Sequence, residues 1–427
     1  MGVVARDLRG HGRDPICLQP VVGSAGRGAI GFGAASSGAA SSGAAMTTLA
    51  GRSAPLDNDN RSRLLLQRND FLKLVDAELA TAVQELQQEW RSVENDDGVT
   101  DILGEHDLVH LLGELVDCGG KRIRPLMTYC GWLSAGGRGR DSSGPRTSFD
   151  DVVRTSAALE LLQAFALIHD DVMDESLSRR GRPAIHIQAA ALHRAASAQG
   201  DATRFGESIA ILVGDLAHAE ADHLVSELPR PLRAIWRSLV VELVCGQRRD
   251  LVGSATGRQD LAYARSVSRM KSGCYTVERP LQLGAAAASA SDAVQRSLGV
   301  YGHEVGVAFA LRDDMLGIWG DPVITGKPAG DDLISAKPTI ILALAKTNLI
   351  AEPAAAALAR AGSPEFTARD LVTVQEAMRE SGVAETVEKM ITSHVDAALS
   401  ALDPQILAYE GIELLTQLAH EIAWREK

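Results

Sequence analysis

Apolar residues at helical spacing are the feature that most restricts the fold of this chain. From about residue 63, apolar side chains recur every three or four positions, which places them on one face of an α-helix. Such stretches cover residues 63–86, 108–116, 152–168, 208–228, 239–251 and 300–318. No stretch alternates as a strand does, and the aromatic residues that strands favour make up only 4% of the chain. The sequence therefore predicts an all-α protein with ten or more helices.

The first 60 residues differ in composition from the rest. Residues 33–45 read GAASSGAASSGAA, a repeat without side chains that could fill a core. We expect a disordered leader over residues 1–60 and one helical domain over residues 61–427. Met46 directly follows the repeat, so translation starting there is an alternative to a functional leader.

Charge and cysteine usage exclude several classes of protein. The net charge is −12, from 43 Lys and Arg against 55 Asp and Glu, so no nucleic acid partner is expected. The five cysteines are scattered, without the spacing of a zinc site or a disulfide framework. The sequence has no run of 18 or more apolar residues and no secretory signal, which predicts a cytoplasmic protein that does not span a membrane.

Three aspartates gather at the end of one apolar helix. Asp170, Asp171 and Asp174 follow the apolar stretch that begins near Asp151, and they lie at about 0°, 100° and 40° around the helix. Three carboxylates near the negative end of a helix dipole are unfavourable unless a cation compensates them. Clustered carboxylates suit Mg²⁺, which bridges one or two of them to substrate phosphates. The alternative is a solvated acidic helix end.

A second aspartate cluster follows another apolar helix. Asp313 and Asp314 come directly after residues 300–311, and Asp321 falls on the same face if the helix persists that far. One acidic helix end is ordinary. Two of them, each attached to an apolar helix, indicate a pair of facing metal sites.

Basic residues near glycine, proline or serine accompany both clusters. They are found in the segment Gly119–Pro125 (GGKRIRP), at Arg179 and Arg180, at Lys271 beside Ser272, and at Lys327 and Lys337. A single lysine is usually a solvated surface charge. Acidic helix ends interleaved with several basic loops, in a chain of negative net charge, fit two diphosphates together with several Mg²⁺ ions.

The order of these motifs along the sequence resembles that of a known protein family. GGKRIRP, DDVMDESLSRRG, GQRRD, KSG, FALRDDMLGIWGD and GKPAGDDL follow one another within residues 60–427, and the set resembles the trans-isoprenyl diphosphate synthases. The last two motifs are similar to the actinobacterial geranylgeranyl diphosphate synthase-like branch. The resemblance implies a single large helical bundle of the isoprenoid synthase type with a central active-site cavity. It also implies a homodimer that condenses isopentenyl diphosphate with allylic diphosphates.

The resemblance assigns metal-binding roles to the aspartates. Asp170 and Asp174 would bind Mg²⁺ with Asp171 in support, and Asp313 would bind a further Mg²⁺ with Asp314 in support. The metal and the basic residues would stabilise the departing diphosphate. The isopentenyl double bond would attack the allylic carbocation that remains, and the resulting cation would lose a proton, so no side-chain nucleophile is required.

The resemblance also assigns the substrate-binding residues. The allylic diphosphate would be held by Arg179, Lys271 and Lys327, of which Arg179 and Lys271 are the expected catalytic cations. Ser272 and Lys337 belong to the same substrate-binding set. The isopentenyl diphosphate site would consist of Lys121, Arg124, Arg180 and Gln163, and Gln163 lies on the carboxylate face of its helix.

Two positions depart from the family pattern. The third aspartate of the second motif is replaced by Gly317, and the glutamine that normally follows Phe309 is Ala310. Since Ala310 removes a polar group that would help to position the allylic end, we expect weaker activity with some substrates.

Product length is also predicted from the resemblance. Phe165, five residues before the first motif, is followed by Ala166, and the motif carries no insertion. In the family this pattern goes with a geranylgeranyl (C20) product, while farnesyl (C15) and longer products remain open.

Two other classes of protein could carry aspartate-rich helices of this kind. A class I terpene cyclase lacks the GGKRIRP type of loop and typically replaces the second aspartate motif. A non-catalytic regulatory subunit of a heteromeric synthase tends to lose the first motif, which is intact here. Both features favour chain elongation, although Ala310 and Gly317 keep the regulatory subunit open.

Overall fold

The computed structural model describes residues 58–93, 102–138, 148–258, 260–321 and 329–426. The leader predicted over residues 1–60 lies outside these ranges, except for its last three residues, which begin the first helix. The predicted substrate-binding residue Lys327 also lies outside the described residues.

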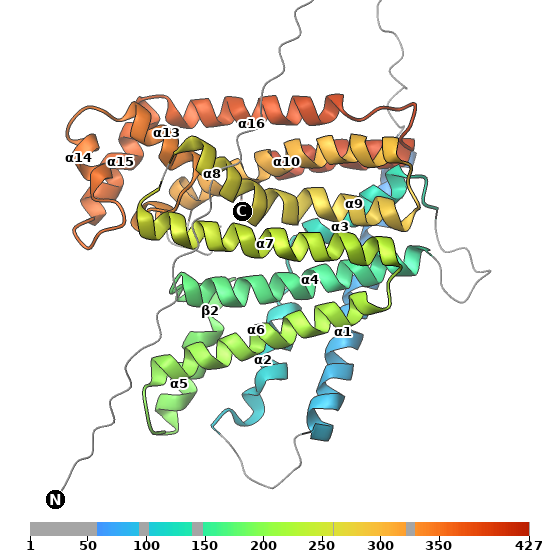
Figure 1. Cartoon of the computed structure of the whole chain (residues 1–427), viewed down its shortest axis with the longest axis horizontal. Helices are drawn as coiled ribbons and strands as arrows, with labels where there is room; N and C mark the ends of the chain where they lie inside the picture. The colour runs from blue at the N-terminus through green and yellow to red at the C-terminus, as the bar shows by residue number, and fades with distance from the viewer. Residues whose placement is uncertain (1–57, 94–101, 139–147, 259, 322–328, 427) are drawn as a thin grey trace, which may run out of the picture. The chain divides into compact units, whose positions relative to one another are not determined.

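Helices account for most of the described residues, and the only strands there form one short hairpin, which confirms the predicted all-α class (Figure 1). The first half contains α1 (Asn58–Val93), α2 (Leu108–Asp117), α3 (Ile123–Ser134), α4 (Ser148–Met173), α5 (Ile185–Ala195), α6 (Ala202–Ser226) and α7 (Arg230–Thr256). The second half contains α8 (Leu261–Val267), the π-helix η2 (Ser268–Glu278), α9 (Arg279–Ala287), α10 (Asp292–Trp319), α12 (Asp331–Ile334), α13 (Ile340–Asn348), α14 (Ala354–Ala359), α15 (Ala368–Glu380), α16 (Val383–Ser400) and α17 (Tyr409–Ala423). A short 3₁₀ turn, η1 (Gly104–His106), precedes α2, and a two-stranded hairpin, β1 (Ser178–Arg179) with β2 (Arg182–Pro183), follows α4.

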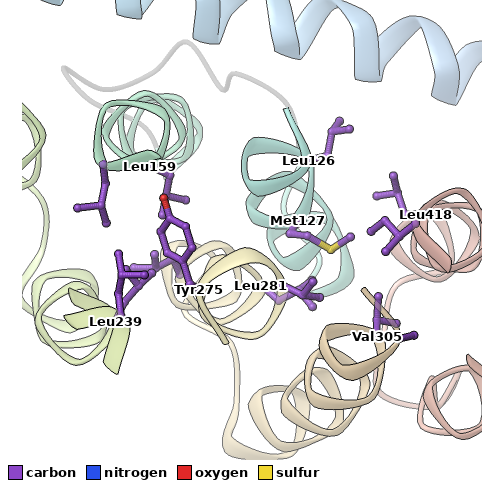
Figure 2. Close-up of a cluster of buried hydrophobic side chains, with 14 of the residues drawn as sticks. Leu126, Met127, Leu159, Leu239, Tyr275, Leu281, Val305 and Leu418 are labelled. Carbon is purple, nitrogen blue, oxygen red and sulfur yellow. The ribbon is translucent and has the colours of Figure 1, made fainter. Parts of the chain in front are cut away.

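The continuous helical segment η2–α9 lies at the centre of the bundle. Figure 2 looks along it and shows Tyr275 and Leu281 surrounded by apolar side chains of α3, α4, α7, α10 and α17. The labelled side chains from those helices are Leu126, Met127, Leu159, Leu239, Val305 and Leu418, each at most 2% exposed. Because this central segment also carries Lys271 and Ser272, the core packing directly positions two predicted site residues.

Glycines allow the helices around the central segment to approach closely. A Cβ at Gly284 of α9 would lie 2.7 Å from the carbonyl carbon of Thr128 on α3, and one at Gly131 of α3 would lie 2.9 Å from that of Leu281. A Cβ at Gly246 of α7 would likewise lie 2.5 Å from the backbone nitrogen of Lys271. Backbone-to-backbone packing of this kind leaves no room for a side chain, so these helices depend on glycine at the contact points.

Among the described residues, α4 is long and apolar enough to cross a membrane by length and composition. However, 67% of its apolar window is buried inside the protein, and it packs against α1, α3 and α6. A buried core helix meets the same criteria, so the apolar character of α4 is explained by its central position in the bundle.

Replacing Gly284 by alanine should destabilise the protein, because the added methyl group would overlap the backbone of Thr128. We expect the free energy of unfolding, measured by urea denaturation, to fall by about 1–3 kcal/mol. Gly299→Ala is the matched control, since its new methyl group would meet only the Gln282 side chain, at 3.6 Å. That change should leave stability unaltered or raise it by up to about 1 kcal/mol. Equal losses in the two variants would contradict the role of close helix packing.

Candidate functional site

Each carboxylate of the first aspartate cluster is paired with a cation from another segment. Lys271 Nζ lies 3.0 Å from Asp170 Oδ1, and Lys337 Nζ lies 2.6 Å from Asp174 Oδ2. Arg179 donates to both carboxylate oxygens of Asp171, with Nε 2.9 Å from Oδ1. Three anions at the end of α4 are therefore compensated by three cations.

These pairs shift the pKa values of the groups involved. Burial by itself raises the pKa of Asp170, but Lys271, Lys337 and Arg179 outweigh burial and hold that pKa well below its usual range. Burial lowers the pKa of Lys271, and the charges of Asp170 and Asp250 more than offset that effect, so its pKa is raised. Both groups are consequently ionised across the physiological range.

Helix geometry predicts that the three aspartates share one face. In the structure, Asp171 has different surroundings from Asp170 and Asp174. Asp170 and Asp174 each keep 17% of their side chains exposed and meet lysines from η2 and from the segment after α12. Asp171 is only 3% exposed and lines a small cavity with Arg179, against α2 and α5. Successive residues of an α-helix are rotated by about 100°, so Asp171 faces different neighbouring helices from Asp170.

Two polar residues of α7 complete this cluster and were not assigned a role from the sequence. Gln247 Nε2 donates to Asp170 Oδ1 at 3.0 Å, and Asp250, which is 6% exposed, accepts a hydrogen bond from Lys271. Both belong to the GQRRD motif, and their spacing of three residues places them on one helix face. That spacing was the signal in the sequence that both residues share a helix face. The close approach of the backbones at Gly246 and Lys271 brings them to Lys271.

Lys271 and Ser272 lie on the π-helix η2, which the sequence did not predict. Both side chains are half-buried. A π-helix widens the turn and changes the direction of the side chains that follow, and such segments are often found at functional sites.

The hairpin after α4 positions Arg179 and Arg180. Arg180 and Gly181 form its two-residue turn with φ values of 54° and 76°, a conformation that matches the twist of the paired strands. Arg179 points to Asp171, whereas Arg180 Nη1 donates to the carbonyl oxygens of Leu115 (3.3 Å) and Gly119. The two adjacent arginines therefore have different partners, and Arg180 anchors the GGKRIRP segment through the carbonyl oxygen of Gly119.

Two of the four residues predicted for isopentenyl diphosphate, Gln163 and Arg124, are connected through Tyr275. The Tyr275 hydroxyl donates to Gln163 Oε1 at 2.8 Å, and the Arg124 guanidinium lies 4.1 Å from the centroid of the Tyr275 ring. Arg180 lines the same small cavity as Gln163. Arg124 Nε is buried without a hydrogen-bond partner among the described residues, so this arginine has an unused donor.

The remaining basic residues of this segment have other surroundings. Lys121 is exposed at the start of α3. Arg122 is paired with Glu160 and with Asp76, the latter at 2.9 Å, so it links α3 to α4 and α1. Its position next to Lys121 in the sequence gave no indication of this structural role.

The second aspartate cluster has a different environment. Asp313 is 63% exposed at its side chain and is paired at 2.8 Å with Arg425, which also stacks on the ring of Phe309 at 4.2 Å. Asp314 Oδ2 is buried without a hydrogen-bond partner. Burial, followed by the charges of Asp332 and Asp313, raises the pKa of Asp314 well above its ordinary value.

One expectation for the second motif is corrected. Helix α10 ends at Trp319, so Asp321 does not continue the helical face of Asp313. Gly320 is already extended, with φ −62° and ψ 143°, and this conformation stops the helix. Ala310 is 2% exposed, so a glutamine at this position would have to fit into a buried environment rather than into open space.

The donor set fits Mg²⁺ only in combination with a substrate. Among the described residues, no three His, Cys, Asp or Glu side chains are close enough to hold a metal ion by themselves. The carboxylates of Asp170, Asp174 and Asp313 are hard oxygen donors, and the buried Oδ2 of Asp314 has no hydrogen-bond partner in the part of the chain that the structure describes. Mg²⁺ typically takes one or two carboxylates and completes its shell with phosphate oxygens and water, which is the combination these residues allow.

Phe165 points from α4 toward α6. Its ring stacks on His218 of α6, with centroids 4.7 Å apart, and lies edge-on to His169 at the same distance. Ala166 is half-buried beside it. The predicted chain-length residue is therefore the centre of a three-ring cluster between α4 and α6, and His218 is a member that the sequence did not indicate.

Comparison with known proteins places this arrangement among prenyl diphosphate enzymes. The family model described as polyprenyl synthetase matches residues 105–374. The geranylgeranyl diphosphate synthase of Mycobacterium tuberculosis is 32% identical over 310 residues, which are 70% of this chain and 79% of that protein. The geranylfarnesyl diphosphate synthase of Aeropyrum pernix is 29% identical over 324 residues, which are 73% of this chain and 92% of that protein.

A solved structure shows the same similarity. The geranylgeranyl pyrophosphate synthase from Corynebacterium glutamicum, complexed with isoprenyl diphosphate and magnesium, aligns with a TM-score of 0.74 at 36% identity. The alignment covers 83% of this chain and 98% of that one.

Replacing Asp250 by asparagine should destabilise the protein, because half-buried Lys271 would lose one of its two carboxylate partners. We expect the free energy of unfolding at pH 7 to fall by about 1–3 kcal/mol in urea denaturation. Glu385→Gln is the control, since Glu385 forms an exposed pair with Lys389 and its loss should change stability by less than about 0.5 kcal/mol. A wild-type stability for Asp250→Asn would show that Lys271 does not need this partner.

Proposed function

Because the chain belongs to the polyprenyl synthetase family, we propose that it is a Mg²⁺-dependent prenyl transferase that joins isopentenyl diphosphate to allylic diphosphates. The product is a short-chain all-trans prenyl diphosphate, chiefly geranylgeranyl diphosphate. The observation that carries the proposal is the set of paired charges at the end of α4, where three carboxylates and three cations converge from separate segments. Such a set can exchange its internal ion pairs for contacts with a metal and a diphosphate.

The cations of this set bind and orient the allylic diphosphate. Lys271, Lys337 and Arg179 lie within hydrogen-bond reach of carboxylates, so phosphate oxygens entering the site can replace those carboxylates as their acceptors. As the bond between the allylic carbon and the diphosphate breaks, the same cations stabilise the negative charge that develops on the leaving oxygen. Mg²⁺, held by Asp170, Asp174 and Asp313, would supply further charge neutralisation to that leaving group.

The second substrate is bound by residues around Tyr275 and Arg180. Arg124 and Arg180 offer guanidinium groups to the diphosphate of isopentenyl diphosphate, and Gln163 lies with Arg180 at the same cavity. Tyr275 fixes both Gln163 and Arg124, which keeps these donors in place before the substrate arrives. Lys121, exposed at the start of α3, and Ser272, on η2, remain proposals for further contacts.

The complete first aspartate cluster disfavours a regulatory subunit, because each of its carboxylates lies in a cation-lined site. A farnesyl diphosphate synthase would share the same charged residues and differ only in the depth of the pocket. The proteins to which this chain is similar include geranylgeranyl and geranylfarnesyl diphosphate synthases, which supports the longer product.

We propose a cytoplasmic location. Cys118, Cys130, Cys245 and Cys274 are all free thiols, as expected in a reducing compartment. Cell fractionation that placed the protein in the membrane pellet would contradict this proposal.

We further propose a homodimer that forms through the outer faces of α6 and α7. Both helices expose apolar side chains, including Leu212 (50%) on α6 and Val241 (54%) and Val244 (52%) on α7. A surface of this kind on two neighbouring helices is typical of a protein interface. Light scattering after gel filtration should give twice the chain mass, and Val244→Glu should give the mass of one chain. Val300→Glu, which alters an equally exposed valine on α10, should leave the dimer intact.

The activity is tested with labelled isopentenyl diphosphate, Mg²⁺ and each allylic primer in turn, followed by sizing of the products. We expect C20 as the main product and no incorporation in EDTA. Lys271→Ala should lower kcat/KM by about 10²–10³-fold, since it removes a donor to the leaving diphosphate. Lys389→Ala, an exposed lysine on α16, should change kcat/KM little. Failure of every primer would favour the regulatory subunit.

Replacing Phe165 by alanine tests the predicted control of chain length. If the ring cluster with His169 and His218 limits the pocket, Phe165→Ala should give products longer than those of the wild type. Phe205→Ala is the control, because Phe205 packs on His193 at the other end of α6 and should not alter product length. Wild-type product lengths from Phe165→Ala would show that Phe165 does not limit the chain.

A further inference from the structure

Glu160 is a buried carboxylate in the middle of α4 that the proposed reaction does not use. It is 5% exposed, and its Oε2 accepts a hydrogen bond from Arg122 Nη1 at 2.5 Å. Its other oxygen, Oε1, is buried without a hydrogen-bond partner among the described residues. Glu160 also lines the same small cavity as Gln163 and Arg180. It therefore lies among the residues that the proposed function assigns to isopentenyl diphosphate.

Arg122, the partner of Glu160, has an unusual backbone conformation. Its φ of 51° and ψ of 35° lie in the left-handed region, which is unfavourable for a residue with a Cβ atom. It stands directly before α3, where the chain turns into that helix. Its guanidinium group bonds to Glu160 on α4 and, at 2.9 Å, to Asp76 on α1. Ion pairs to two helices hold the residue in a conformation that its own backbone preference disfavours.

The turn at Arg122 lies between two residues predicted for the isopentenyl diphosphate site. Lys121 precedes it, and Arg124 follows it in the first turn of α3. A change in the backbone angles of Arg122 would rotate the chain on either side and redirect these two cations relative to each other. The conformation that Glu160 stabilises is thus part of the geometry of the site.

The other end of this segment is fixed by Arg180, which also lies near Glu160. Arg180 donates to the carbonyl oxygen of Gly119, and a Cβ at Gly120 would lie 3.1 Å from its Nη2. Burial lowers the pKa of Arg180, and the charge of Glu160 is the largest that opposes this effect. One carboxylate therefore acts on the guanidinium groups that hold both ends of the segment carrying Lys121.

We propose that Glu160 is a positioning residue for isopentenyl diphosphate, which fixes the turn at Arg122 before the substrate binds. Lys121 and Arg124 are thereby oriented toward the same diphosphate. Glu160 acts through Arg122 rather than by touching the substrate, because a carboxylate beside a diphosphate would repel it. The inference rests on the proposed function, since it assigns a role within the binding site of the second substrate.

The test is calorimetric titration with isopentenyl diphosphate alone, so that no turnover occurs, and separately with an unreactive allylic thiodiphosphate and Mg²⁺. Glu160→Gln keeps the shape of the side chain and removes its charge. It should weaken the binding of isopentenyl diphosphate by about 10–100-fold and leave that of the allylic analogue within about 2-fold. Glu78→Gln is the matched control, because it removes a half-buried partner of Arg154 that also joins α1 to α4, and it should bind both ligands as the wild type does.

Two substitutions of Arg122 separate the turn from the ion pair, and they test the inference even if Glu160→Gln does not fold. Arg122→Gly and Arg122→Ala both remove the partner of Glu160, but only glycine adopts a positive φ without strain. Arg122→Gly should therefore bind isopentenyl diphosphate about 5–10-fold more tightly than Arg122→Ala. Equal affinities of these two variants would overturn the role of the turn.

The outcomes separate this inference from the proposed function. If the wild type binds no isopentenyl diphosphate, both are overturned. If the wild type binds it and Glu160→Gln binds it as tightly, the inference alone is overturned. An equal loss of affinity for both ligands, together with a lower unfolding midpoint, would show that Glu160 only stabilises the fold.

Discussion

Lys271 forms the interaction on which the site depends, because it joins three helical segments through one buried charge. Its ammonium group bonds to Asp170 at the end of α4 and to Asp250 on α7, residues that are 101 and 21 positions away in the sequence. Burying a charge costs several kcal/mol unless opposite charges surround it. The position of η2 relative to α4 and α7 is therefore tied to the electrostatics of the site, and the close approach at Gly246 makes this geometry possible.

The charge distribution of the site contrasts with that of the whole chain. The protein carries a net charge of −12, yet the end of α4 balances three carboxylates with Lys271, Lys337 and Arg179. A balanced site can accept a metal and a diphosphate together without a large change in net charge. The donors are already in place before substrate binds, so little reorganisation is required when charge develops on the leaving group.

The two aspartate motifs have different electrostatic environments. The first is compensated by cations from the protein, whereas the second combines an exposed Asp313 with a buried Asp314 that lacks a partner for one oxygen. Buried carboxylates near other carboxylates favour the protonated form or a bound cation. In the second motif Arg425 pairs with Asp313, whereas burial and the charges of Asp332 and Asp313 raise the pKa of Asp314.

The sequence alone determined the fold class and most members of the site, since apolar spacing within a helix and the order of motifs are local properties. It predicted Asp170 and Lys271 as members of one site, and the structure brings Lys271 within 3.0 Å of Asp170, while their binding roles stay predictions. Only the tertiary structure decided which residues of other helices meet them. His218 carries no local signal for its contacts, and the spacing in GQRRD only places Gln247 and Asp250 on one helix face. The partners of all three depend on how closely the helices pack, as they do at Gly246.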